Sequence, residues 1–94
     1  MNLEEFEWDE NKNVLNQINH RVSFEEAILA FSDPNNFERY DQAHSLAEDR
    51  WLLYGISGLD ILIVSFTEKD GIIRIISARK AEKKEEEEYF KWVW

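Results

Sequence analysis

The sequence predicts a compact α+β single domain over residues 1–94, in which an antiparallel β-meander is joined to two N-terminal helices and a C-terminal helix. Two observations favour this fold class. Apolar residues fall at helical spacing early in the chain and again near its end. Between them, residues 50–79 hold three apolar runs of strand length that are joined by short connections. A chain of 94 residues is long enough for one modest core.

The first elements are predicted from alternation and from a helix cap. Within residues 3–8, Phe6 and Trp8 alternate with Glu5 and Glu7, which predicts a short strand. Asp9 follows as a helix N-cap, and a helix is expected over about residues 10–19. Its apolar face consists of Val14, Leu15 and Ile18.

The second helix has a stronger start signal. Ser23 is a good N-cap, and Glu26 stands three residues later, which is the spacing of a capping box. Asp33-Pro34 ends the helix, because the residue before proline disfavours helical geometry. The helical face consists of Phe24, Ala27, Ile28 and Phe31.

The strands are predicted from apolar runs and turn residues. A strand is expected at 37–41, a polar loop at 42–48, and the meander strands at 50–56, 61–67 and 72–79. Asp70-Gly71 favours a tight hairpin before the last strand. Apolar residues occupy both parities of these strands, so both faces of the sheet should be covered at least in part. The two early helices can cover one face, and the other needs the C-terminal helix or another chain.

The last helix is expected over about residues 82–92 and ends in an aromatic segment. Tyr89, Trp92 and Val93 stand at helical spacing, which favours docking on the domain's own sheet. The alternative is a partner interface, either with another protein or with a second copy of this chain, because interfaces are rich in aromatic residues.

Composition limits the classes of function. The net charge is −9, which favours basic partners and counts against nucleic-acid binding, although a local group of arginines can still hold a phosphate. The chain has no cysteine, which excludes disulfides and thiolate chemistry and fits the cytoplasm. No apolar run approaches the ~20 residues of a membrane span, so no membrane role is expected.

Polar residues that could support catalysis are scattered along the chain. No metal-binding set is apparent, because neither histidine has a second ligand at a familiar spacing, and no cofactor is expected. RNA cleavage without metal needs a base, an acid and a cation, because RNA supplies its own 2′-hydroxyl nucleophile. Residues of these types are His20, His44, Glu48, Arg50, Arg74, Ser77, Arg79 and Tyr89.

Structural roles are the competing interpretation of these residues. His20 ends a helix, where a cation suits the helix dipole. His44 can simply be solvated in its polar loop, and Glu48 and Arg50 can pair at the surface. Arg74 is either an edge residue that reaches solvent or a charge held by a carboxylate beneath a pocket.

Strand parity separates the two arginines of the last strand. Arg74 and Arg79 are an odd number of residues apart, so a regular strand directs them to opposite faces. They share one site only if a bulge intervenes or if the strand ends before Arg79. Arg50 shares its face with Leu52 and Tyr54.

Four blocks follow one another along nearly the whole chain. They are Phe6-Glu7-Trp8-Asp9-Glu10 with Lys12 and Asn16; His20 with 22–27, Phe31 and Asp33-Pro34; Asp41, His44-Ser45, Glu48, Arg50 and Gly55; and 74–79 with Ala81, Glu85 and Tyr89. In this order and spacing, the blocks resemble the BrnT family, the toxins of bacterial type II toxin–antitoxin pairs.

The resemblance implies a RelE-like ribonuclease fold and a cognate antitoxin that binds and inhibits the toxin. In such a pair, DNA is contacted only indirectly, through the antitoxin's DNA-binding domain. The matching positions imply a functional pool of His20, His44, Glu48, Arg50, Arg74, Arg79 and Tyr89.

The chain also departs from the family pattern. Where the family typically has Lys-His-Gly, this chain has Asn19-His20-Arg21, and residues 85–88 form an acidic block. Two hypotheses therefore remain open. The first is a metal-independent endoribonuclease toxin, and the second is a catalytically weak or inactive homologue that acts by binding a basic protein partner.

Overall fold

The computed structural model describes residues 5–93, so Leu3 and Glu4 of the first predicted strand lie outside the described residues. The elements are β1 (Phe6–Glu7), α1 (Glu10–His20), α2 (Phe24–Phe31), β2 (Phe37–Tyr40), a 3-10 turn (Gln42–His44), β3 (Trp51–Ser57), β4 (Asp60–Lys69), β5 (Ile72–Lys80) and α3 (Lys83–Val93). The α+β class is confirmed, and the predicted boundaries agree with the structure to within a few residues.

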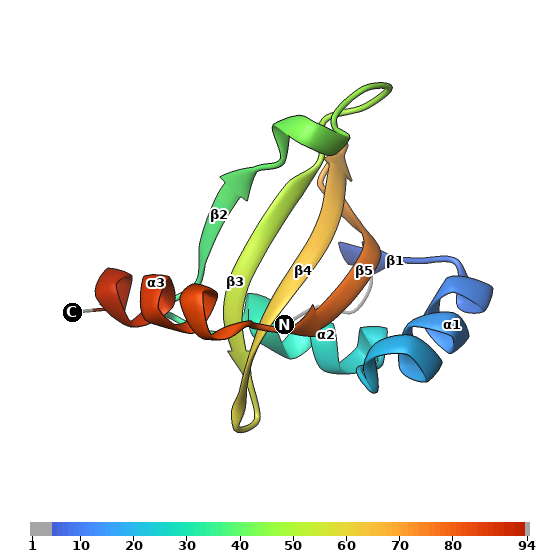
Figure 1. The fold of residues 1–94 in the computed structure, drawn as a ribbon. Coiled ribbons are helices and arrows are strands. Elements are labelled where there is room, and N and C mark those ends of the chain that lie inside the picture. The colour runs from blue at the N-terminus through green and yellow to red at the C-terminus, as the bar shows by residue number, and fades with distance from the viewer. Residues whose placement is uncertain (1–4, 94) are drawn as a thin grey trace.

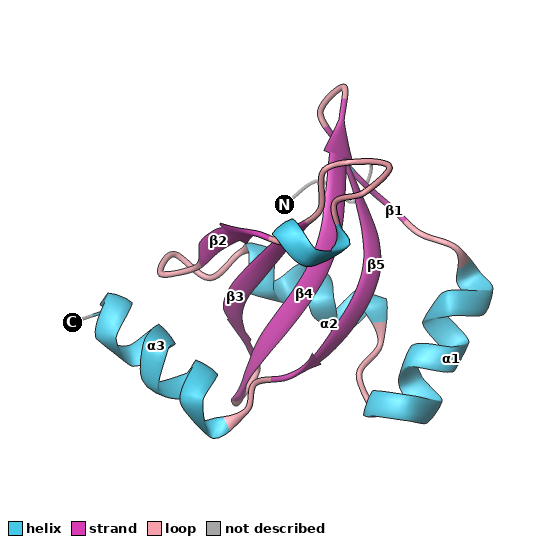
Figure 2. Ribbon diagram, turned by 45° about the horizontal axis from the view of Figure 1, so that its top comes forward, coloured by secondary structure: helices cyan, strands magenta, loops and turns pink. Residues whose placement is uncertain are grey.

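The strands form one sheet in the order β1-β5-β4-β3-β2. The meander of β3, β4 and β5 is antiparallel, as predicted, and β2 pairs antiparallel with β3. The short strand β1 adds to β5 in parallel. The helix α2 packs behind the curved sheet, whereas α3 lies in front of one end of it (Figure 1 and Figure 2). Asp70 and Gly71 both have positive φ in the β4–β5 hairpin, as the Asp-Gly pair predicted.

The helix α2 packs on the sheet through the face that the sequence predicted. The capping box is present, because Ser23 Oγ accepts from Glu26 N while the Glu26 carboxylate accepts from Ser23 N. Gly55 allows a close approach, since a Cβ at this position would lie 2.4 Å from the Ala30 carbonyl oxygen. The core on this side consists of Val22, Phe24, Ala27, Ile28, Ala30, Leu53, Leu62, Val64, Phe66, Ile75 and Ala78.

The helix α1 packs through polar residues, contrary to its apolar pattern. The buried side chains of α1 are Asn13 and Asn16. The Asn16 amide donates to Ala78 O at 2.7 Å and accepts from Ala78 N at 3.1 Å, so it completes the hydrogen bonding of β5 where β1 has ended. The predicted apolar face points outward, with Val14, Leu15 and Ile18 exposed by 49%, 56% and 70%. These residues are therefore not part of the core.

A bulge in β5 changes which side chains share a face. Ser65 of β4 pairs with Ser77, but the next residue, Phe66, pairs with Ile75, so Ile76 is an extra residue in β5. Arg74 then pairs with Thr67 and Arg79 pairs with Ile63. Their partners on β4 are four residues apart, so the two arginines lie on the same face of the sheet. The bulge that a shared site for Arg74 and Arg79 requires is thus present.

The helix α3 covers one end of this second face. Tyr89 is fully buried, and it packs with a second apolar cluster that consists of Tyr54, Ile61 and Ile63. Docking of Tyr89 on the sheet is confirmed. Trp92 contacts Phe37 of β2, with ring centroids 5.4 Å apart, but it stays 63% exposed, and Val93 is 37% exposed. Of the three predicted docking residues, only Tyr89 is buried. Among residues 5–93, no α-helix covers the rest of the second face (Figure 1).

Candidate active site

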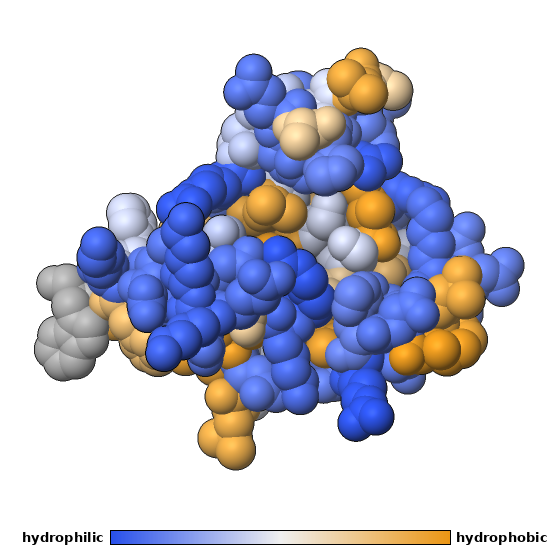
Figure 3. Space-filling model, viewed as in Figure 1, coloured by the Kyte–Doolittle hydropathy of each residue, from blue (hydrophilic) through white to orange (hydrophobic). Residues whose placement is uncertain are grey.

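The uncovered part of the second face is hollowed. In Figure 3 a depression lies between the protruding 3-10 turn region and the α3 side of the molecule, with pale and apolar residues at its floor. A cavity of about 310 Å³ occupies this region. It is lined by Asp41, His44, Arg50, Leu52, Ser65, Ile76, Ser77 and Arg79.

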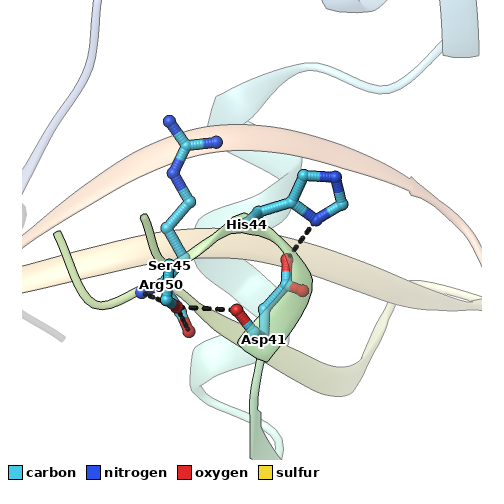
Figure 4. Close-up of polar contacts among 4 residues, drawn as sticks. All are labelled: Asp41, His44, Ser45 and Arg50. Carbon is cyan, nitrogen blue, oxygen red and sulfur yellow. Dashed lines mark hydrogen bonds and ion pairs between the residues drawn. The ribbon is translucent and has the colours of Figure 1, made fainter. Parts of the chain in front are cut away.

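The loop from Asp41 to Arg50 is held closed by its own hydrogen bonds. Asp41 N donates to Arg50 O at 2.9 Å, which extends the β2–β3 ladder by one pair. Ser45 Oγ donates to Asp41 O at 2.6 Å and accepts from Arg50 N at 2.9 Å. His44 and Arg50 are therefore positioned by the same closed loop, although they are six residues apart. In Figure 4 their side chains extend toward the same side of this loop.

His44 is oriented by a carboxylate. Its Nδ1 lies 2.9 Å from Asp41 Oδ2, and because a carboxylate only accepts, Nδ1 carries the proton of this bond. The Asp41 side chain is 13% exposed, whereas that of His44 is 68% exposed. The second ring nitrogen, Nε2, is thus left for a solvent or substrate group.

Arg50 provides an unsatisfied donor in the cavity. Its Nε atom is buried and has no hydrogen-bond partner among residues 5–93. A buried donor without a partner is costly, and such atoms in native proteins call for an explanation. An anion bound in the cavity would satisfy it, and the planar guanidinium fits phosphate oxygens well.

Arg79 lines the same cavity, but its guanidinium is already paired. Its two terminal nitrogens donate to the two Glu85 oxygens at 2.7 and 2.8 Å, which ties the end of β5 to α3. The hydrogen bonds with Glu85 raise the pKa of Arg79 and, reciprocally, hold the pKa of Glu85 below its usual value. Arg79 and Arg50 therefore line the same cavity, but only Arg79 has its guanidinium paired with a carboxylate of the described residues.

Arg74 and Glu48 lie on the adjoining part of the same face. Both line a cavity of about 320 Å³, in which Arg74 Nη1 is 3.5 Å from Glu7 Oε1. The Arg74 side chain is half exposed, so this ion pair is loose. Glu48 also lines a third cavity, together with His44 and Arg50. Five of the seven predicted residues thus converge on one continuous surface.

The structure does not bring His20 and Tyr89 to this surface. His20 is the exposed last residue of α1 and lines none of the three cavities. The Tyr89 hydroxyl donates to Asp33 Oδ2 at the other end of the sheet, where Asp33 also accepts from Ile56 N. Burial, and then the bond to Asp33, raise the pKa of Tyr89. This geometry describes a structural tyrosine that fixes α3 to the loop after α2.

Three residues of the site were not among the predicted functional residues. Asp41 orients His44, Ser45 closes the loop, and Ser65 lines the cavity from β4. The spacing of Asp41 and His44, three residues apart within a short turn, is a signal that could have indicated their pairing. Ser65 has no such signal, because only the strand register places it beside Ser77.

Comparison with known proteins assigns the chain to a family. Residues 8–85 match the family described as the ribonuclease toxin BrnT of type II toxin–antitoxin systems. The chain therefore belongs to the BrnT family of ribonuclease toxins. No curated protein matches the chain.

Two further findings concern other kinds of site. Within residues 5–93, no group of three or more His, Cys, Asp or Glu side chains is arranged to hold a metal ion. None of the helices in that range has the length and apolar composition that a bilayer crossing requires.

Proposed function

We propose that this protein is a metal-independent endoribonuclease in which Arg50 holds the scissile phosphate and His44 transfers a proton. The observation that carries the proposal is that Arg50 lines a cavity together with the Asp41–His44 pair, while its buried Nε has no hydrogen-bond partner within residues 5–93. A cationic donor for the phosphate and an oriented imidazole are two of the groups that cleavage of a phosphodiester requires.

The reaction uses the RNA's own nucleophile. The 2′-oxygen forms a bond to the adjacent phosphorus and loses its proton to a base, while the bond from phosphorus to the 5′-oxygen breaks and that oxygen gains a proton from an acid. The products are a 2′,3′-cyclic phosphate and a free 5′-hydroxyl. Arg50 stabilises the negative charge that grows on the non-bridging oxygens, and Nε2 of His44 carries out one of the proton transfers.

Glu48 and Arg74, on the adjoining surface, are the remaining members of the proposed catalytic group. Glu48 lines one cavity with His44 and another with Arg74, which makes it the candidate for the second proton transfer. Arg74 is held only loosely by Glu7 and can turn to a neighbouring phosphate. Glu85 occupies two of the N–H donors of Arg79, so this arginine is a secondary member of the group.

A toxin of this kind needs an inhibitor, and we propose that a cognate antitoxin binds the protein in the cytoplasm and suppresses cleavage. Membership of the BrnT family supports this proposal, because the family's toxins belong to type II toxin–antitoxin systems. Any contact with operator DNA is then made by the antitoxin rather than by this acidic chain.

The second candidate function is that of a weakly active or inactive homologue that binds a protein partner. The pairing of Arg79 with Glu85 favours it, because a potential phosphate-binding cation is occupied by the chain's own α3. Asn19 is consistent with this alternative, since it stands where the family typically has lysine.

Purified protein and an RNA substrate distinguish the two functions. The proposal predicts RNA cleavage in the presence of excess EDTA, with 2′,3′-cyclic phosphate ends, and growth arrest when the chain is expressed without its antitoxin. Folded protein that leaves RNA intact, and expression that leaves growth unaffected, would establish the inactive homologue instead. Coexpression with the antitoxin should restore growth.

A further inference from the structure

A groove of about 490 Å³ lies between β2 and α3, away from the proposed catalytic group. Phe37 and Trp92 form its apolar wall, with ring centroids 5.4 Å apart. Trp92 is mostly exposed although it lines this groove. An exposed tryptophan beside an apolar wall is typical of a protein interface.

One side of the groove is the edge of β2, which pairs with no other strand of the described residues on that side. In the sheet order, β2 is the terminal strand. Asp41 N donates to Arg50 O, and hydrogen-bonded pairs alternate along an antiparallel ladder. The backbone N–H and C=O groups of Arg39 and Phe37 therefore point toward β3, whereas those of Glu38 and Tyr40 point away from it. The backbone N–H and C=O groups of Glu38 and Tyr40 are thus placed to pair with an added strand.

The net charge of the chain favours one kind of partner. Within the groove, Arg39 Nη1 pairs with Glu88 Oε2 at 2.6 Å. Glu38 and Lys91 also line the groove, so its formal charges balance. The chain as a whole has a formal charge of −9, which repels the phosphates of an RNA strand and attracts a basic polypeptide.

We propose that the groove between β2 and α3 is the docking surface for an extended, basic segment of the antitoxin. The segment adds to the edge of β2 as a further strand and seats an apolar side chain against Trp92. This is strand addition, in which main-chain bonds supply affinity and side-chain pockets supply specificity. The inference rests on the proposed function, because that proposal supplies the antitoxin.

The position of the groove also explains inhibition. β2 ends at Tyr40, and Asp41, which orients His44, is the next residue. A segment that follows β2 past Tyr40 therefore runs toward the Asp41–His44 pair. Binding along the strand edge therefore shields the Asp41–His44 pair, which lines the same cavity as Arg50.

The test is the affinity of purified antitoxin from the same operon for variants of the full chain, measured by titration calorimetry. Glu38→Pro removes one outward-facing N–H and leaves the ladder to β3 intact, and Glu38→Ala is its matched control. Trp92→Ala removes the aromatic wall, and Leu15→Ala, on the exposed face of α1, is its matched control. Thermal unfolding confirms that each variant is folded.

We expect Glu38→Pro and Trp92→Ala each to weaken antitoxin binding by about tenfold or more, the range of an interface hot spot, whereas the two controls bind like wild type. RNA cleavage by the free variants should be unchanged. Wild-type affinity in both groove variants overturns the proposal, as does loss of binding in Leu15→Ala alone. If Trp92→Ala raises the KM for RNA and leaves antitoxin affinity intact, the groove serves RNA and the proposal is wrong.

Failure of this inference is distinguishable from failure of the proposed function. An inert wild-type protein on RNA contradicts the proposed ribonuclease, whatever the antitoxin affinities show. Unchanged affinities in an active ribonuclease contradict only the docking surface.

Discussion

The two halves of one sheet face differ in how their charged groups are satisfied. In the half beneath α3, Arg79 is bound by Glu85 and Arg39 by Glu88. In the other half, Arg50 has a buried donor without a partner among the described residues, and Arg74 is held only loosely. The sheet is continuous across both halves, so the difference comes from α3 and the carboxylates it carries.

The comparison shows that the number of arginines on a face is a poor guide to its function. A paired guanidinium stabilises the fold, whereas an unpaired and partly buried one is available for a ligand. Four arginines lie on this face, and their pairing separates a structural half from a candidate catalytic half. The predictions that follow test this division, beginning with the largest expected effect.

Replacement of His44 should have the largest effect. His44→Ala removes the proposed proton-transfer group and should lower the rate of RNA cleavage by about 10²- to 10⁴-fold, the usual contribution of general acid–base catalysis. His20→Ala is the matched control and should retain activity, because His20 lines none of the cavities on this face. Cleavage assays on a defined RNA measure both. An equal loss in both variants would contradict the division of roles.

Arg50→Ala should reduce cleavage by about 10²-fold, because one preorganised donor to the developing charge is lost. Arg39→Ala, in the half beneath α3, removes an arginine that is already paired with Glu88, and its cleavage rate should be close to that of wild type. Steady-state kinetics on the same RNA provide the comparison. If Arg39→Ala is the more damaging change, the catalytic group lies under α3 instead.

Arg79→Ala should affect stability more than cleavage. It removes two bonds to Glu85 that tie α3 to β5, and the unfolding free energy should fall by about 1 kcal/mol, a modest figure because the arginine is partly exposed. Denaturant unfolding measures the loss. A large drop in cleavage with unchanged stability would place Arg79 in the catalytic group.

A fall in pH should first destabilise the half of the sheet face that lies beneath α3. Burial alone would raise the pKa of Asp33, but the bonds from Tyr89, Ile56 and Asn35 together hold it below its usual value, and the Arg79 bond does the same for Glu85. Carboxyls with a depressed folded pKa contribute stability that is complete above the unfolded pKa and is lost as pH falls through the folded one.

The unfolding free energy should therefore decline below about pH 4.5. The decline should be shallower in Glu85→Gln, because a glutamine has no carboxylate to protonate. Unfolding curves recorded between pH 3 and pH 6 test this expectation, and parallel slopes for wild type and Glu85→Gln would contradict it.

Local signals in the sequence predicted most elements of the fold. The Ser23 capping box, the Asp9 cap and the Asp70-Gly71 hairpin depend on neighbouring residues, so they could be identified without the fold. The bulge at Ile76 depends on the register between β4 and β5, which no local pattern shows. For the same reason, strand parity alone could not place Arg74 and Arg79 on one face.

The helix α1 shows a different limit of sequence patterns. Its apolar stripe predicted the wrong buried side, because Asn13 and Asn16 are used to satisfy backbone groups of α2 and β5. A buried amide that replaces a missing strand partner looks like a surface residue in the sequence. The candidate site was predictable as a set of residues, but the separation of Arg50 from Arg79 depends on Glu85, a contact that only the folded chain reveals.

The most direct test of the central claim is a nuclear magnetic resonance titration with a 2′-deoxy oligonucleotide, which binds like the substrate but lacks the nucleophile. The account predicts that the Arg50 Nε–H signal and the His44 ring signals shift on binding, while the Arg79 Nε–H signal stays in place. Shifts confined to Arg79 and α3, or an Arg50 signal that is unmoved at saturation, would contradict the claim that the unpaired arginine marks the substrate site.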